Sequence, residues 1–517
     1  MPYTRPGVYV SESPMQSAVT RRDGTGTAAF IGTAERGPTT PTLIDSWAAY
    51  QQTFGKITNA YDLGYAVYSY FANGGRVCYV TRAVGASSAV ATNATISYNP
   101  VTSGAGSTAA SVAFTLSARS AGTWANSAAS VANVGLVATP TAGVVTPTST
   151  VYPTFNLTLS LNGSEVEAWT ELSLDPTSSR YVATILNEYS AYVTVSNVLA
   201  NPGTSAVAAW TTLSTSAYFT GGNNGGTVLP TGYTNALDAL ASIEEPIMIN
   251  VVGISDATVV NAALAKAEAR GDSFVIVDPV AGATTAGAVT AVTSTYSTST
   301  GYGAVYYPML KMLDPAKTGI GAIRNCYPGG AVAGIYSRME RERTVAKAPA
   351  GFGVQIANAI GLETPYTESV AGTLYEAGVN TFRAIPGGGI SINGARTLKK
   401  NYPDKYIPIR RSLNYVKSSV KSLTQFAVFE PNDERLWGTI EARLNRFLTD
   451  FWGSGGLRGR TADEAFYILC NDTNNTNASI ASGQVNVEVG VSLLYPAEFI
   501  VINVSQWIGG ANTAENL

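Results

Sequence analysis

The sequence predicts a mixed α/β protein of several domains, in which a β-rich domain is inserted into an α/β chain. Strand-like and helix-like runs alternate near the start and again after about residue 230, which is typical of a largely parallel sheet. Between these regions, apolar and polar residues alternate with period two, as they do in antiparallel strands with one face packed on the core and the other exposed to solvent. With 517 residues, the chain is long enough for three or four domains.

Composition argues against several kinds of active site. The chain has no histidine, so we expect neither a His-based catalytic triad nor a His-ligated metal. Cys78, Cys326 and Cys470 are far apart and form neither a CxxC pair nor a disulfide framework, and the sequence leaves open whether any of them bridges two subunits. A net charge of −3 argues against nucleic-acid binding. We therefore expect no catalytic residue, no cofactor and no metal.

Charge is sparse and unevenly spread. Charged residues make up 13% of the chain, against a typical share of about 25%. Residues 89–330 carry 7 basic and 13 acidic side chains, whereas residues 331–517 carry 18 and 17. The low charge and the 51 glycines suggest that other copies of the chain cover much of its surface. The longest strongly apolar run, Pro246–Ile254, is far too short for a membrane span, and the first residues lack a signal peptide. We expect a protein made in a reducing cytoplasm.

The first part of the chain reads as an arm followed by an α/β segment. Prolines at positions 2, 6 and 14 exclude a helix from residues 1–25, where Gly7–Glu12 is a short β-prone run. Residues 26–83 are predicted to begin a core domain that the chain then leaves. Its expected order of strand, helix, helix and strand falls on Ala28–Gly32, Ser46–Phe54, Leu63–Phe71 and Arg76–Arg82.

Residues 84–205 are predicted to form the inserted β-rich domain. They alternate as in Phe155–Leu161, before an Asn-Gly turn, and a helix is expected through Tyr181–Tyr189. Residues 206–345 are predicted to form an α/β middle domain. Its helix, strand, helix and strand are expected at Thr234–Ile243, Ile247–Val252, Ala257–Arg270 and Ser273–Val277.

The charge-dense region 346–497 is expected to contain a strand at Val379–Arg383 and a long helix at about Asp433–Trp452. Asn432 or Asp433 can cap this helix, which has one apolar stripe. Two interpretations of its basic edge stay open: a solvated surface, or contact with an acidic partner. The arginines along this edge are Arg435, Arg443 and Arg446.

Motifs that could indicate an enzyme are weak. Gly221–Gly226 lacks the Lys-Ser/Thr pair of a P-loop, and Gly387–Gly389 has the same weakness. Asp272 and Asp278 flank a predicted strand, where catalytic acids often lie in α/β folds. Asp before Pro279 is more often a turn former, however. Linkers and turns are therefore the favoured interpretation.

Both ends carry a β-prone run without a local partner strand. Gly7–Glu12 is followed by Pro14, and Glu498–Ser505 lies close to the last residue. Free strands of this kind either fray or pair with other chains. Head-to-tail pairing of identical chains makes rings or helical filaments. The residues expected in such pairing are Val8, Tyr9, Val10, Phe499, Ile500, Val501, Ile502 and Val504.

Short motifs in order along nearly the whole chain resemble those of contractile tail sheath proteins of bacteriophages and related injection machines. The match is weakest in 84–205, and Met339–Glu342 departs from the family pattern. The motifs include Arg5–Glu12, Ala29–Pro38, Gly74–Arg82, Ala121–Asn126, Gly330–Tyr336, Gly378–Asn380, Gly394–Leu398, Ile407–Arg411 and Pro496–Val501.

The resemblance implies a structural subunit without enzymatic activity. It implies a discontinuous core domain, from 26–83 and 346–497, that faces a tail tube, with 84–205 outermost. The arms, 1–25 and 498–517, then link neighbouring subunits by adding strands to each other's core sheets. Six-fold discs of subunits stack around the tube, and contraction drives the tube through the host cell envelope for genome delivery.

The implied partners are copies of the chain itself, the tail tube protein, and baseplate and tail terminator proteins, with neither direct nucleic-acid contact nor membrane insertion. The implied location is the virion tail, after assembly in the host cytoplasm. The sheath protein of a tailocin or of an extracellular injection system would show the same sequence features, so both stay open as alternatives. An alternative of another class is a β-rich adhesin or surface-layer protein.

Overall fold

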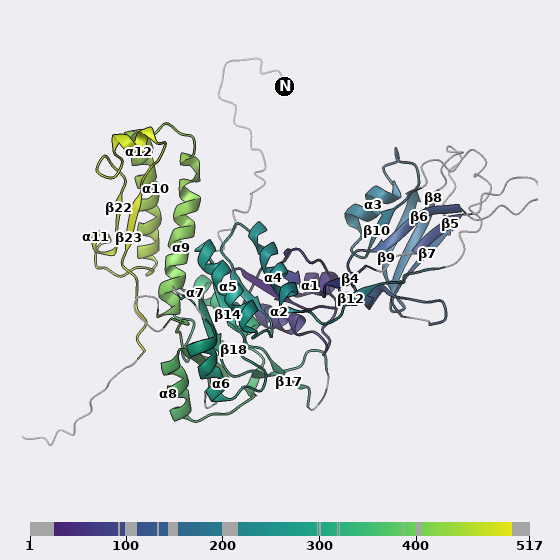
Figure 1. Ribbon diagram of the computed structural model, residues 1–517, viewed down its shortest axis with the longest axis horizontal. Helices are drawn as coiled ribbons and strands as arrows, with labels where there is room; N and C mark the ends of the chain where they lie inside the picture. Colours follow the sequence, from purple (N-terminus) through teal and green to yellow (C-terminus); the bar gives the residue numbers. More distant parts are fainter. Residues whose placement is uncertain are drawn as a thin grey trace, which may run out of the picture.

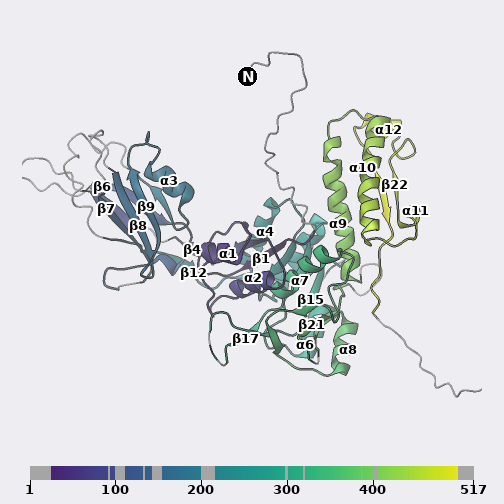
Figure 2. The same cartoon turned by 180° about the vertical axis from the view of Figure 1, so that it is seen from behind.

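The chain, described here from a computed structural model, has three domains in a row (Figure 1). A β-rich domain lies at one end, an α/β domain in the centre and a helical domain with a small hairpin at the other end, as the reverse view also shows (Figure 2). The predicted mixed α/β fold is confirmed. The structure describes residues 25–90, 94–98, 111–131, 134–142, 154–198, 216–296, 298, 301–317, 319, 321–385, 387–399 and 405–498.

A nine-stranded sheet forms the centre, in the order β18-β21-β20-β15-β14-β13-β1-β3-β2. The six strands from β20 to β3 run parallel, and antiparallel strands close both sides. Ala28 on β1 lies in register with both Cys78 and Met248. The strands are β1 (Ala28–Gly32), β2 (Thr42–Ile44), β3 (Cys78–Arg82), β13 (Met248–Val251), β14 (Phe274–Val277), β15 (Gly303–Tyr306), β18 (Gln355–Ile356), β20 (Val379–Ala384) and β21 (Ile390–Asn393).

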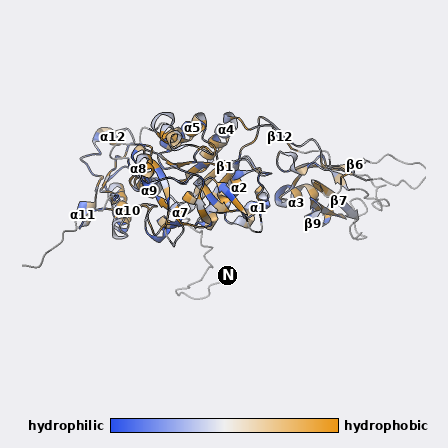
Figure 3. Ribbon diagram, turned by 90° about the horizontal axis from the view of Figure 1, so that it is seen from below, coloured by the Kyte–Doolittle hydropathy of each residue, from blue (hydrophilic) through white to orange (hydrophobic). Residues whose placement is uncertain are grey.

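Helices cover both faces of this sheet, so its central strands are apolar on both sides. Phe30 points into the layer with α1, α2 and α7, whereas Ile31 points into the layer with α4, α5, α6 and α8. Figure 3 shows α4 and α5 on one side of β1 and α2 and α7 on the other. The helices are α1 (Trp47–Phe54), α2 (Asp62–Ala72), α4 (Pro230–Ala239), α5 (Ala257–Arg270), α6 (Thr285–Thr290), α7 (Gly329–Glu342) and α8 (Glu368–Ala377).

The domain boundaries differ from the prediction in two places. Strands β1 and β3 of residues 26–83 lie in one sheet with β18, β20 and β21 of region 346–497, but also with β13, β14 and β15 of the predicted middle domain, so the core and the middle domain are not separate. The inserted domain also continues beyond residue 205, since β11 (Ala217–Tyr218) pairs with β7 and Phe219 is fully buried in the core of the insert. Short strands of this kind have no periodicity of their own, which is why the sequence placed the boundary too early.

Helices α2 and α7 pack unusually closely, because α7 begins with small residues. A Cβ atom on Gly330 would lie 2.1 Å from the carbonyl oxygen of Ala66, and one on Gly334 would lie 2.5 Å from that of Tyr70. Neither backbone can yield without moving its helix. The motif Gly330–Tyr336 is therefore explained by helix packing.

We expect Gly330→Ala to destabilise the central domain by at least about 2 kcal/mol, because the added methyl group overlaps backbone. The midpoint of thermal unfolding should fall by about 4–8 °C. Gly372→Ala is the control, since this glycine lies on exposed helix α8 with nothing within 4 Å of an added Cβ. The control should gain about 0.5–1 kcal/mol from helix propensity. Equal midpoints for the two variants would contradict the close-packing argument.

The inserted domain leaves and re-enters the body at one point. β4 (Ser87–Ala89) pairs with the returning β12 (Asn223–Gly225). Beyond this pair, the sheets β10-β6-β5 and β11-β7-β8-β9 pack together, with Phe114 stacked on Phe155. The remaining elements are β5 (Ala94–Tyr98), β6 (Ser111–Ala118), β7 (Leu136–Ala142), β8 (Thr154–Leu161), β9 (Ser164–Ser173), α3 (Val182–Tyr189) and β10 (Val193–Ser196).

The C-terminal domain stands on helix α9 (Ile407–Thr424). The first half of α9 is buried against the central domain, where Asn414 donates a hydrogen bond to the carbonyl of Ser273 (2.9 Å), and its second half packs on α10 (Glu434–Gly453). The other elements of the domain are α11 (Ala462–Ala465), β22 (Phe466–Leu469), α12 (Asn477–Ala481) and β23 (Glu488–Val491).

A further sheet lies at the side of the central domain and consists of β16 (Leu310–Leu313), β17 (Ile323–Cys326) and β19 (Ala359–Leu362). None of the described helices is long and apolar enough to cross a membrane.

Candidate assembly interface

The C-terminal domain presents a sheet of only two strands, the hairpin β22–β23, on helices α9 and α10. Within the described residues, each of its strands has one partner strand, so each has an outer edge that a further strand can join. Ile468, Val489 and Val491 face the helices but remain half-buried. A two-stranded sheet is marginal in water. A strand added at either edge would widen the sheet and bury more of these half-buried apolar residues.

The connection between the two hairpin strands is held by asparagines. Asn474 donates its amide to the carbonyl oxygens of Leu469 (2.8 Å) and Asn486 (2.9 Å). Asn475, itself buried, accepts a hydrogen bond from the backbone N–H of Asn486 (2.6 Å). On the outer face, Tyr467 donates to Glu488 across the strands (2.6 Å). These bonds fix the hairpin as a preformed template, a feature that the sequence analysis missed.

The predicted basic edge lies on the exposed side of α10. The helix begins one residue after its predicted start, because Asp433 caps it by accepting a hydrogen bond from the backbone N–H of Leu436 (2.9 Å). Arg435, Arg443 and Arg446 are all exposed, and the guanidinium of Arg443 lies 3.7 Å from the ring centroid of Phe426. The structure therefore leaves all three free to contact a partner.

The two predicted arm strands lie outside the described residues. They contain Val8, Tyr9 and Val10 at one end and Phe499, Ile500, Val501, Ile502 and Val504 at the other. The described chain begins at Thr25, beside α7 and α9, and ends at Glu498, beside α8.

The acidic residues considered as catalytic candidates hold the fold together. Asp278 is fully buried and accepts hydrogen bonds from the side-chain amide of Asn250 (3.1 Å) and the backbone N–H groups of Gly253 (3.0 Å) and Gly329 (2.8 Å). Burial raises the pKa of Asp278 to about 6, although these donors oppose the shift. Asp272 pairs with the neighbouring Arg270 at 3.1 Å. Asp278 thus ties β13 and β14 to the start of α7.

The two glycine-rich stretches also lie in ordinary structural elements, a short strand and a turn. Asn223–Gly225 forms β12, the strand by which the chain leaves the inserted domain. Gly387–Gly389 lies in the turn between β20 and β21, where the backbone N–H of Ile385 donates to the carbonyl of Gly389 (2.9 Å). Both agree with the linker and turn interpretation.

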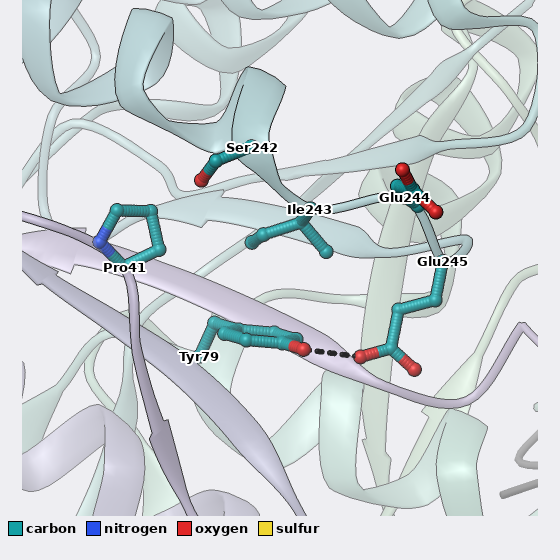
Figure 4. A pocket seen from close by; sticks show the side chains of 6 residues that line it. All are labelled: Pro41, Tyr79, Ser242, Ile243, Glu244 and Glu245. Carbon is teal, nitrogen blue, oxygen red and sulfur yellow. Dashed lines mark hydrogen bonds between the residues drawn. The ribbon is translucent and has the colours of Figure 1, made fainter.

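A hollow of about 370 Å³ lies beside β3 (Figure 4). Tyr79 donates a hydrogen bond to Glu245 (2.5 Å), and the carboxylate of Glu244 points away from that pair. Its lining contains neither lysine nor cysteine. The bond between Tyr79 and Glu245 ties β3 to the segment that precedes β13.

The three cysteines are buried within the subunit and unpaired. Burial raises the pKa of Cys326 to about 12 and raises that of Cys78 even further. Buried, protonated thiols are unreactive toward disulfide exchange. In this conformation they are not placed to bridge two subunits.

Two family models match the chain. The phage tail sheath protein central domain matches residues 226–398, and the phage tail sheath C-terminal domain matches residues 400–506. Together they cover more than half of the 517 residues. None of the curated protein sequences matches the chain.

Solved structures of contractile sheaths have the same fold. The contracted sheath complex of an extracellular contractile injection system, PVC, is 20% identical, with 98% of each chain covered and a TM-score of 0.57. The contracted helical sheath of the anti-feeding prophage is 19% identical, with 97% of this chain and 99% of that chain covered and a TM-score of 0.56. A sheath tail protein from Listeria innocua is 15% identical, with 87% and 89% covered and a TM-score of 0.56.

Proposed function

Because the chain belongs to the phage tail sheath protein family and is a structural subunit of a contractile sheath, we propose that its copies polymerise around a tail tube and drive that tube through a host envelope. In a phage, this movement delivers the genome. In a tailocin or an extracellular injection system, the same movement drives the tube without a viral genome. We also propose that the chain has no catalytic activity, as expected of a structural family.

The observation that carries this proposal is the hairpin β22–β23 on α9 and α10. Its edges and half-covered apolar residues suit strands donated by the arms of neighbouring subunits, that is, residues 7–12 and 499–504. Residues 499–504 form a short run of mostly apolar and β-branched side chains, which favours a buried strand. When each copy donates a strand to the next, the contact joins two different surfaces. Contacts of this kind build either closed rings or helical filaments that can go on growing.

The tube is proposed to lie against the exposed side of α10, where Arg435, Arg443 and Arg446 would meet acidic tube residues. Baseplate and tail terminator proteins are proposed to close the two ends of the sheath, and assembly is proposed to take place in the host cytoplasm.

Negative-stain electron microscopy of the purified chain, with and without tail tubes, tests this function. We expect long striated tubes, and shorter, wider ones after contraction. A chain that stays monomeric at high concentration in the presence of tubes would contradict the proposal and favour an adhesin or surface-layer role.

The inserted domain is proposed to be outer decoration. Its contact with the body is made largely by arginines: Arg82 donates to the carbonyl of Ala121 (2.5 Å), and the Arg36 guanidinium lies 5.0 Å from the ring centroid of Tyr192. Removing the insert therefore exposes charged groups at this contact rather than an apolar surface.

We expect a variant with residues 91–221 replaced by a short Gly/Ser linker to fold, to form tubes and to contract. The β4–β12 pair remains and holds the two cut ends together. Thermal melting of the monomer, followed by electron microscopy, checks both steps. A cooperatively melting variant that forms no tubes would mean that the insert makes required lateral contacts.

A further inference from the structure

The described chain ends in a buried ion pair. The carboxylate of Glu498 accepts two hydrogen bonds from Arg396, at 3.1 Å from Nε and 2.8 Å from Nη2, and a third from the hydroxyl of Tyr375. The guanidinium also lies 3.8 Å from the ring centroid of Tyr375 and donates to its carbonyl (2.9 Å). The side chains of Arg396 and Glu498 are only 10% and 9% exposed. We call Arg396, Glu498 and Tyr375 the C-terminal latch.

The C-terminal latch is fixed to the central sheet through Asn380 on β20. The side chain of Asn380 donates to the carbonyl of Arg396 (2.8 Å) and accepts from its N–H (2.8 Å). A Cβ on Gly394 would lie 2.8 Å from the Asn380 amide oxygen, so this loop requires glycine. The motifs Gly378–Asn380 and Gly394–Leu398 and the described part of Pro496–Val501, residues 496–498, thus lie together in the structure.

A second buried ion pair holds the start of the described chain. Glu340 on α7 accepts hydrogen bonds from the backbone N–H of Thr25 (2.6 Å) and from its hydroxyl (2.9 Å). Arg411 on α9 donates to Glu340 (2.6 Å) and to the Thr25 hydroxyl (3.1 Å), and its guanidinium lies 4.7 Å from the ring centroid of Tyr336. The side chains of Arg411 and Glu340 are 2% and 12% exposed. We call Arg411, Glu340 and Thr25 the N-terminal latch.

We propose that these two latches are positioning devices for assembly. They anchor Thr25 and Glu498, the residues from which the two terminal segments extend, to the central domain. Tension on an exchanged strand therefore passes into the central sheet. This inference rests on the proposed strand exchange. An ion pair that is shielded from water resists separation, because pulling it apart leaves two unpaired charges. The Arg396–Glu498 pair is in addition bidentate. Anchoring the residue next to an exchanged strand also lowers the conformational entropy that the strand loses when it pairs with a neighbouring subunit.

The C-terminal latch should be insensitive to mild acid. Burial alone would raise the pKa of Glu498, but the hydrogen bonds from Arg396 and Tyr375 and the charges of Arg396 and Lys405 lower it overall. A lowered pKa means that the carboxylate contributes stability at neutral pH and loses it only as pH falls through that lowered value. Sheaths should therefore keep this latch closed well below neutral pH.

The test uses the full chain with Glu498→Gln and Glu340→Gln, and with Glu376→Gln as the matched control on the exposed side of α8. Each monomer is melted, sheaths are assembled on tubes, and their dissociation is followed in increasing urea. We expect Glu498→Gln to melt close to the wild type, because glutamine can still accept a hydrogen bond from Arg396, but to yield at least about tenfold fewer intact sheaths, the change expected when a charge-assisted hydrogen bond is lost. Glu340→Gln also removes the carboxylate that pairs with the buried Arg411 between α7 and α9, so its monomer should melt earlier and its sheath yield should fall as well. The control should match the wild type.

Failure of the latch proposal can be told apart from failure of the proposed function. If the wild-type chain forms no sheath, the proposed function is wrong. If the wild type assembles and both latch variants give sheaths of equal yield and urea resistance, the latch proposal is wrong. A Glu498→Gln monomer that melts well below the wild type also contradicts the proposal, because the Arg396–Glu498 pair would then hold the fold rather than the segment.

Discussion

Removing residues 499–517, or residues 1–20, is expected to abolish sheath assembly and leave a folded, soluble monomer. The central sheet, the two sheets of the insert and the C-terminal hairpin are built from strands between residues 28 and 491, so their backbone pairing does not depend on either segment. The truncated chain would lack the strand that a neighbouring hairpin accepts. Electron microscopy and size-exclusion chromatography measure assembly, and circular dichroism measures the fold.

A matched variant separates the strand itself from mere chain length. Replacing residues 499–517 by a Gly/Ser segment of equal length keeps the C-terminal latch at Glu498 but removes the mostly apolar, β-branched run of residues 499–504. This variant should fail to assemble as the truncation does. Normal tubes from either truncation would discard strand exchange, and tubes from the Gly/Ser variant would show that only the length matters.

Changing Arg435, Arg443 and Arg446 to glutamate is expected to abolish binding to tail tubes. All three are exposed, so the fold should survive, with a loss of about 0.5–1 kcal/mol from the contact between Arg443 and Phe426. Co-sedimentation with purified tubes measures binding. Wild-type binding should weaken with salt, because the Debye length falls from about 10 Å at 0.1 M to about 3 Å at 1 M.

The control for this prediction is Glu441→Lys. Glu441 is exposed on the same helix but lies away from the three arginines, so its reversal should leave tube binding unchanged. Unaltered co-sedimentation of the triple variant would show that the arginines are simply a solvated helix surface. Tighter binding of Glu441→Lys would indicate a general effect of charge rather than a defined contact.

Local sequence patterns predicted the elements whose residues repeat with a clear period. Helix α5 has the bounds predicted for it, and α10 begins one residue from its predicted start, after the Asp433 cap. The strand before the Asn-Gly turn was predicted to within one residue, as β8. Such patterns reflect one amphipathic face, which each segment shows regardless of its neighbours. The order of motifs along the chain likewise indicated the family, because it does not depend on how segments pair.

The sequence by itself thus determined the mixed α/β class and the family. Tertiary structure alone decided that β1 and β3 complete the sheet begun by β13, and that Arg396 meets Glu498 across 102 residues and Arg411 meets Glu340 across 71. It also decided that, in the part of the chain that the structure describes, the hairpin β22–β23 is a sheet of two strands. The physical reason is that strand neighbours and ion-pair partners are chosen by distance in space. A buried arginine and a surface arginine look the same in a sequence, and only the packing around Arg396 and Arg411 distinguishes these two from the exposed arginines of α10.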